Sequence, residues 1–244
     1  MKALLRFTVA LLATQAVVIH AQLLPGDVTV VAYNTGSLDD FAWVAFKTIP
    51  AGTVLNFTDS SVSNGFFRMS EHLGTITTSG PLTWSDTNDL PAGTVVKFDV
   101  FWDRGLALGA EMDLSASGDQ IFIYQGAIVT NTSLVYPWQG DPLHATLLFG
   151  INFANNGWDN LHGGSTSLSA IPPGLSTNDY TAVHVNNKGY GYYTGPRRGS
   201  ITKLRQAIAT PANWTTSNSA FSPGVWPSQF EIVPPNAGML LRID

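Results

Sequence analysis

The stretch Ser115-Ala-Ser-Gly-Asp-Gln-Ile-Phe-Ile-Tyr-Gln-Gly126 decides the fold. Its first four residues are small and turn-forming, and a run of large side chains follows. Ile121 and Ile123 point to one face and Phe122 and Tyr124 to the other, because successive side chains of a strand alternate. Large or β-branched residues on both faces, with Gly126 at the end, predict a central strand that is buried on both faces.

Further segments with the same signature recur along the chain. Strands are expected at residues 27–34, 41–46, 53–59, 73–78, 95–102, 128–136, 146–153, 181–185 and 230–241. Residues 155–174 and 186–199 are expected to be loops, since Gly, Pro, Ser and Asn punctuate them. Turn signals about every 8 to 12 residues, with no biased linker, predict an all-β fold: one β-sandwich domain of about ten short strands over residues 22–244.

A short internal repeat accompanies these strands. Ile49-Pro-Ala-Gly-Thr-Val-Leu-Asn-Phe57 recurs as Leu90-Pro-Ala-Gly-Thr-Val-Val-Lys-Phe98. Proline followed by glycine presets a tight turn, and the β-branched residues behind it continue as a strand. Two copies predict a reused strand entry rather than a solenoid.

One short C-terminal helix is expected at residues 200–210. Ser200 can cap its N-terminus, and Ile201, Leu204 and Ile208 share one face at helical spacing. Pro211 ends the helix, and Trp214 is expected to pack near that end.

The N-terminal 21 residues have the pattern of a secretory signal peptide. Lys2 and Arg6 precede an apolar run at residues 7–19, and Ala21 is the expected cleavage position. That run is shorter than the ~20 residues of a membrane-spanning helix, so we expect a secreted, extracellular protein without a membrane span. Loss of the two leader cations changes the net charge from −5 to −7, which argues against a nucleic-acid partner. The chain has no cysteine, so its core has to be stable without disulfides.

Several short motifs occur in a fixed order along the mature chain. They are Gly26-Asp-Val28, Asp39-Asp-Phe-Ala-Trp-Val44, the Ile49 turn leading to Phe57-Thr-Asp59, Leu114-Ser-Ala-Ser-Gly-Asp-Gln120, Asn156-Gly-Trp158, Pro172-Pro-Gly-Leu175 and Asn213-Trp214. This set resembles a poorly characterised secreted β-domain of bacterial surface and extracellular proteins, and it is more distantly similar to lamin-tail-like β-sandwiches. The resemblance implies an extracellular β-sandwich, with no established activity or catalytic residues. This chain departs from the multidomain members because it reaches Asp244 without a sorting segment or a catalytic module.

Acidic residues near strand ends suggest a cation site. Asp39, Asp40 and Asp59 are the candidate calcium ligands, because they flank strand ends that are expected to meet and calcium prefers carboxylate oxygens. The competing interpretation is that these side chains cap turns by accepting backbone N–H groups. Calcium is the candidate cofactor, and none is required by the sequence.

The expected loop at residues 186–199 suggests a contact surface. Tyr190, Tyr192 and Tyr193 lie among glycines, and Arg197 and Arg198 follow them. Flat rings with polar tips suit contact with sugars, proteins or surfaces. The alternative is that the tyrosines pack on the sandwich and the arginines are solvated.

Other chemistry has weaker signals. Scattered histidines without metal-ligand spacing, and no Gly-x-Ser-x-Gly motif, disfavour a hydrolase. Asn56, Asn131 and Asn213 start glycosylation sequons, and Asn56 lies inside an expected strand. We therefore predict a non-enzymatic structural or adhesive module whose partner is an extracellular matrix, a surface polymer or a carbohydrate. A calcium- or carbohydrate-binding domain is the alternative, and a secreted hydrolase is the third interpretation.

Overall fold

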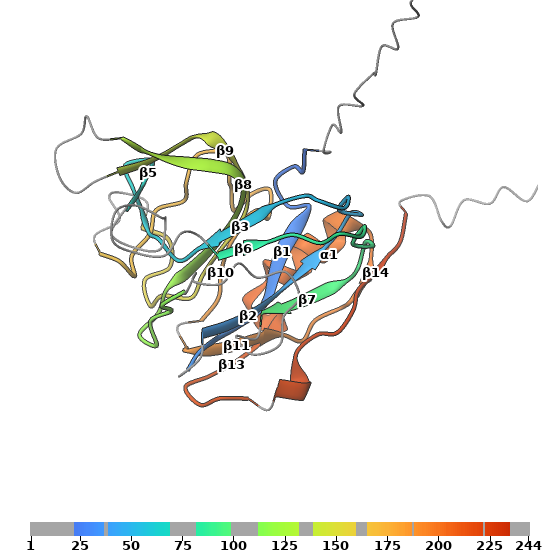
Figure 1. The fold of residues 1–244 in the computed structure, drawn as a ribbon. Helices are drawn as coiled ribbons and strands as arrows, with labels where there is room; N and C mark the ends of the chain where they lie inside the picture. Colours follow the sequence, from blue (N-terminus) through green and yellow to red (C-terminus); the bar gives the residue numbers. More distant parts are fainter. Residues whose placement is uncertain are drawn as a thin grey trace, which may run out of the picture.

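Two predominantly antiparallel sheets packed face to face form the computed structural model of this protein (Figure 1). The five-stranded sheet has the order β13 (Trp214–Ser217), β11 (Tyr190–Tyr193), β1 (Val28–Thr35), β2 (Asp39–Ala45) and β7 (Val95–Phe98). The larger sheet has the order β4 (Val62–Ser63), β5 (Phe66–Arg68), β9 (Gln139–Asn152), β8 (Gln120–Asn131), β3 (Leu55–Thr58) and β6 (Leu82–Trp84), and β10 (Ala182–His184) lies parallel to β9. A small parallel pair joins β12 (Arg198–Gly199) to β14 (Glu231–Ile232). The predicted all-β sandwich is confirmed.

The structure describes residues 22–36, 39–68, 82–98, 112–131, 139–159, 165–186, 188–221 and 223–234. The predicted signal peptide, the strand expected at 73–78 and the tail after residue 234 lie outside these ranges. In the described part of the chain, no helix is long and apolar enough to cross a membrane.

Strand β8 is buried on both faces, as its sequence predicts. Ile121 and Ile123 belong to the large core between the two sheets. Phe122 and Tyr124 belong to a second cluster on the opposite face, where Trp158 and residues 170–175 pack against the sheet. Because side chains alternate along β8, this one strand contributes residues to two hydrophobic clusters, one on each face of the sheet.

The prediction that Gly126 ends this strand is wrong. β8 continues to Asn131, so residues 128–131 are no separate strand, and the pairing with β9 shifts between Ala127 and Val129. Gly126 has φ +85°, and a Cβ at this position would collide with the carbonyl oxygen of His144. The glycine is needed for a positive φ and a close backbone approach between two register shifts of a long strand, rather than for a turn.

The two copies of the internal repeat lie next to each other. Ile49 and Leu90 form an antiparallel bridge with reciprocal backbone hydrogen bonds of 2.9 and 2.8 Å. One copy leads into β3 and the other into β7, in opposite sheets. Phe57 and Phe98, at equivalent positions of the repeat, pack edge to face with centroids 4.9 Å apart. The repeat thus joins both sheets at one corner of the core.

The expected loop at residues 186–199 contains an interior strand of the five-stranded sheet instead. β11 (Tyr190–Tyr193) pairs with β1 on one side and β13 on the other. Its glycines suggested a loop, but Gly191 lies where the ring of Tyr33 leaves no room for a Cβ. Close packing, not chain flexibility, accounts for that glycine.

Helix α1 (Ile201–Ile208) confirms the helix prediction. The Ser200 side chain accepts a hydrogen bond from the Lys203 amide, and Leu204 and Ile208 are buried. The 3₁₀ turns η1 (Pro211–Asn213) and η2 (Pro223–Val225) follow α1. Trp214 donates its Nε1–H to the carbonyl of Ile208 over 2.7 Å, as expected for packing at the helix end.

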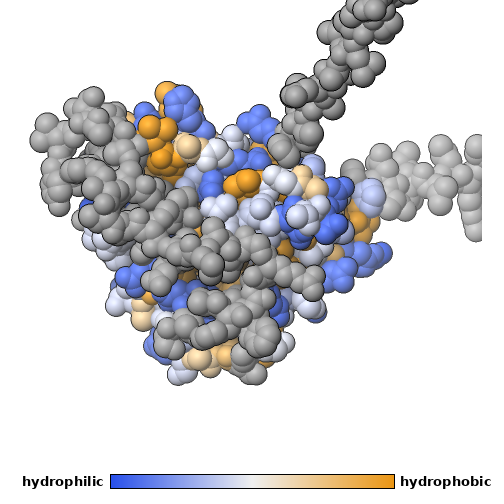
Figure 2. Space-filling model, in the orientation of Figure 1, coloured by the Kyte–Doolittle hydropathy of each residue, from blue (hydrophilic) through white to orange (hydrophobic). Residues whose placement is uncertain are grey.

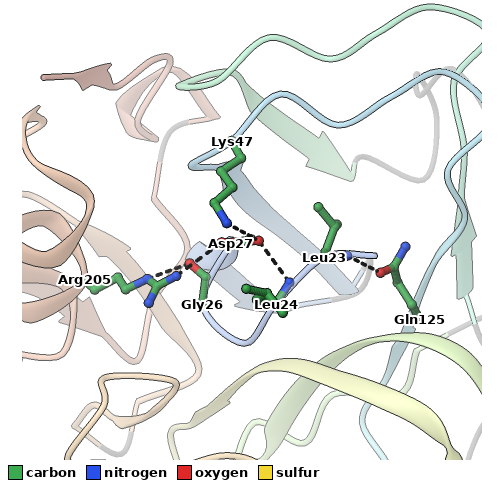
Figure 3. A network of polar contacts seen from close by, with 7 residues as sticks. All are labelled: Leu23, Leu24, Gly26, Asp27, Lys47, Gln125 and Arg205. Atoms are coloured by element: carbon green, nitrogen blue, oxygen red, sulfur yellow. Dashed lines mark hydrogen bonds and ion pairs between the residues drawn. The ribbon is translucent and has the colours of Figure 1, made fainter. Parts of the chain in front are cut away.

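A buried polar network ties the N-terminal segment to α1 (Figure 3). The Asp27 carboxylate, whose side chain is only 3% exposed, lies 3.0 Å from Lys47 Nζ and 3.4 Å from Arg205 Nη2. It also accepts the Leu24 amide, and Arg205 Nε donates to the carbonyl of Gly26 over 2.7 Å. A Cβ at Gly26 would collide with that guanidinium, so the Gly26-Asp27 motif is explained by this network.

Candidate functional site

The outer face of the five-stranded sheet presents a row of polar and aromatic side chains. Phe41 contacts Phe57 of the opposite sheet, so Phe41 faces the core. Asn34, Asp40 and Tyr190 stand at neighbouring positions, because Asn34 pairs with Asp40 on β2 and with Tyr190 on β11. They alternate with core-facing residues and therefore point away from the other sheet.

The chain after β13 completes a cavity over this row. Phe221 packs edge-on against Tyr192, with ring centroids 4.8 Å apart and planes at 83°. Trp226, just after η2, packs partly against the main core. The enclosed volume is about 100 Å³, and its lining is formed by Tyr33, Asn34, Asp40, Lys97, Tyr190, Phe221 and Trp226. All except Tyr33 are half-buried, so the cavity is open to solvent.

Hydrogen bonds fix the polar side of the cavity. Asn34 Nδ2 donates to Asp40 Oδ2 over 3.3 Å, and Asn34 Oδ1 accepts the Gly36 amide over 2.8 Å. These bonds orient the Asn34 amide and place the carboxylate beside it. Lys97 adds an ammonium group on the same face, since it is paired with Ala42, two residues along β2 from Asp40. The site therefore offers one anion, one cation, an amide and the rings of Tyr190, Phe221 and Trp226, with buried Tyr33 behind them.

The predicted contact residues separate in the fold. Tyr190 lines the cavity, and Tyr192 supports it through Phe221. Tyr193 is buried in the core, its hydroxyl donates to the Pro196 carbonyl over 2.8 Å, and burial raises its pKa to about 12.

The two predicted arginines lie beyond the cavity lining. Arg198 lies in β12 and pairs with Glu231 at 2.8 Å, and both side chains are mostly exposed. Arg197 is exposed beside it.

Sequence reasoning missed most of the cavity. It did not single out Asn34, Lys97, Phe221 or Trp226, and Asp40 was proposed only as a metal ligand. No local pattern marks these residues as a group, because they lie on four strands and on a segment near residue 226. Trp226 is the one sequence signal for this cavity, because a tryptophan in a segment rich in turn residues can mark a contact site.

Two of the three candidate calcium ligands, Asp39 and Asp59, contact a separate segment, residues 112–119, whereas Asp40 lines the cavity. Asp39 Oδ2 accepts the Leu114 amide over 2.8 Å, and Asp59 Oδ2 accepts the Asp113 amide over 2.7 Å. Asp39 at the start of β2 and Asp59 after β3 therefore contact the same segment. Backbone capping, the competing interpretation, describes these two contacts.

Charge accumulates around Asp39. Burial raises the pKa of Asp39 to about 6; the Leu114 amide opposes the rise, and the carboxylates of Asp113, Asp59 and Asp40 add to it. Within the described ranges, no group of three or more His, Asp or Glu side chains is arranged to hold a metal ion.

The sequons differ in their accessibility. Asn56 is buried in β3, donates its amide N–H to the Gly126 carbonyl over 2.9 Å and accepts from Thr83. Asn213 donates to the Ala207 carbonyl over 2.8 Å and so caps the end of α1. Asn131 is the last residue of β8. The nitrogen that would carry a glycan is thus engaged at Asn56 and Asn213.

Comparison with known protein families, with curated proteins and with solved structures gave no match. The function of this chain is therefore inferred from its own geometry.

Proposed function

We propose that this protein is a secreted, non-enzymatic module that attaches to an extracellular matrix or surface polymer through the cavity on the outer face of its five-stranded sheet. The observation that carries the proposal is the convergence of Tyr190, Phe221 and Trp226 on one solvent-open cavity. Aromatic rings in such a position supply much of the contact energy in binding sites. The leader pattern and the resemblance to secreted surface domains support the extracellular setting.

The remaining surface favours a local contact site over general adhesion. On the side of the molecule drawn in Figure 2, the described apolar residues lie in separate small groups among hydrophilic ones. Leu143 is the most exposed large apolar side chain among the described residues, at 78%, and it lies in β9, away from the cavity lining. Leu143 therefore offers a matched control for nonspecific apolar adhesion.

Attachment to insoluble polymers tests this function. The protein lacking residues 1–21 would be incubated with polysaccharide particles and with a hydrophobic resin, and the bound fraction measured. We expect Trp226→Ala to reduce binding to a polymer and Leu143→Ala to leave it unchanged. Equal losses in both variants, or binding only to the hydrophobic resin, would contradict the proposal.

A calcium-binding role is the second candidate. Asp39 Oδ1 is buried without a hydrogen-bond partner among the described residues, and burial, with a further contribution from charge repulsion by neighbouring carboxylates, raises the pKa of Asp39. A cation at this position would relieve that repulsion. Thermal unfolding with EDTA and then with millimolar calcium tests it. A rise in Tm that is absent from the Asp39→Asn, Asp59→Asn double variant would support the site, and an unchanged Tm would remove it.

A further inference from the structure

We propose that the cavity binds one neutral sugar ring, at the end or on the side of a polysaccharide or glycan. This inference deepens the proposed attachment function and rests on it, because both use the same cavity. Three properties of the lining point to this ligand: its mixture of rings and hydrogen-bonding groups, its charge, and its size.

The mixture of groups matches the two-sided chemistry of a pyranose. A sugar ring has C–H groups that pack on aromatic faces, and hydroxyls around its edge that both donate and accept hydrogen bonds. Tyr190, Phe221 and Trp226 supply the aromatic surface. Asp40 supplies acceptors, Lys97 supplies donors, and Asn34 carries both kinds of group. A purely apolar ligand would remove water from the charged groups of Asp40 and Lys97 without offering hydrogen bonds in its place, which is costly.

The charge of the lining argues for a neutral ligand. One carboxylate, Asp40, and one ammonium group, Lys97, give the cavity side chains a net charge of zero. An anionic sugar would be attracted by Lys97 but repelled by the Asp40 carboxylate, and a cationic sugar would be attracted by Asp40 but repelled by Lys97. In each case the repulsion offsets the attraction. Neutral hydroxyls can use both groups.

The size of the cavity limits the ligand to one unit. Its 100 Å³ is well below the roughly 300–1,000 Å³ of pockets that enclose drug-sized ligands. A single ring fits that scale, and the open side leaves a path for the rest of a chain. A contact this small predicts a dissociation constant of about 1 mM for a free monosaccharide. Repeated units on a polymer would raise the apparent affinity.

Titration with simple glycosides tests the inference. Tryptophan fluorescence and saturation-transfer NMR would follow binding of methyl glucoside, methyl galactoside and methyl mannoside, with glucuronate, glucosamine and the open-chain sorbitol as comparisons. We expect saturable binding of at least one neutral glycoside, with the charged sugars and sorbitol several-fold weaker. Trp226→Ala should weaken binding about ten-fold or more through lost ring contact.

A milder variant guards against loss of folding. Lys97→Gln keeps an N–H donor on a shorter stem and removes the charge, and we expect it to weaken binding about two- to ten-fold. Leu143→Ala should bind as the unchanged protein does. Circular dichroism and thermal unfolding would establish that each variant is folded before its binding is compared.

Two further binding experiments distinguish whether the bound sugar belongs to a polysaccharide or to a glycan on a protein. Insoluble polysaccharides test a polymer source, and a glycoprotein before and after enzymatic glycan removal tests a protein-linked source. Retention on either one, displaced by the neutral glycoside, supports the inference.

The two proposals fail in different ways. Attachment to polymer that depends on Trp226 but is not displaced by any neutral glycoside would overturn the sugar inference and leave the attachment function standing. Attachment that is insensitive to both Trp226→Ala and Lys97→Gln would overturn both proposals.

Discussion

Replacing Asp39 by asparagine should stabilise the protein at neutral pH. In the folded chain the pKa of Asp39 is raised from 3.8 to about 6, first by burial and then by the neighbouring carboxylates. The folded state therefore holds the proton more tightly than the unfolded state. The free energy of unfolding therefore falls as the pH rises from about 4 to about 6. Above about pH 6, Asp39 is ionised in both states, and the full cost of its buried charge destabilises the folded protein. The asparagine of the Asp39→Asn variant would carry no charge at any of these pH values.

The magnitude follows from the shift. Two pKa units correspond to about 3 kcal/mol at full burial. Asp39 is only half-buried, so solvent screening reduces the expected gain to about 1 kcal/mol. The asparagine side chain can still accept a hydrogen bond from the Leu114 amide. The substitution therefore removes the charge and keeps this hydrogen bond.

Urea unfolding at pH 4, 5, 6 and 7.5 measures this effect through the midpoint of the transition. Asp89→Asn is the control, because exposed Asp89 accepts the Ala51 amide and the substitution makes the same change in net charge. We expect Asp39→Asn to be more stable than the parent protein at pH 7.5 and equal to it at pH 4. A gain that persists at pH 4, or that Asp89→Asn reproduces, would refute the reasoning.

Three further substitutions test the packing of the fold by thermal unfolding. Gly126→Ala should lower the free energy of unfolding by about 2 kcal/mol more than Gly174→Ala does. Both glycines have positive φ, but a Cβ collides with backbone only at Gly126. Equal losses in the two variants would contradict the argument that close backbone packing requires Gly126. Arg205→Met should cost about 2–3 kcal/mol, since it leaves buried Asp27 with fewer partners, whereas exposed Arg198→Met should cost under ~1 kcal/mol. Tyr193→Phe should cost about 1 kcal/mol by removing the hydroxyl that donates to the Pro196 carbonyl, and no loss would show that this bond contributes nothing net.

Local patterns predicted the elements whose signal lies within a few residues. The alternation from Ile121 to Tyr124 predicted a strand with two buried faces, and both faces lie in separate clusters. Ser200 and Pro211 predicted the limits of α1 closely, because capping and the missing proline N–H act over one turn.

Predictions failed where a glycine served a distant neighbour. Glycine in a sequence marks turns more often than strands, so the local patterns predict that Gly126 ends a strand and that Gly191 lies in a loop. In the fold, each glycine lies within a strand and makes room for another part of the chain: the His144 carbonyl at one position and the Tyr33 ring at the other. Neither neighbour can be identified from the residues around the glycine.

By itself, the sequence determined the class of the fold, its principal strand and its helix, because alternation, capping and turn chemistry are local. Only the tertiary structure decided where a ligand could bind. Asn34, Tyr190 and Trp226 are far apart in the sequence, and they meet because β1 pairs with β11 in one register and the chain after β13 returns across that face. A shift of one residue in that pairing would turn Asn34 and Tyr190 to opposite faces of the sheet, since side chains alternate along a strand. The cavity is thus a property of strand register, which depends on long-range packing.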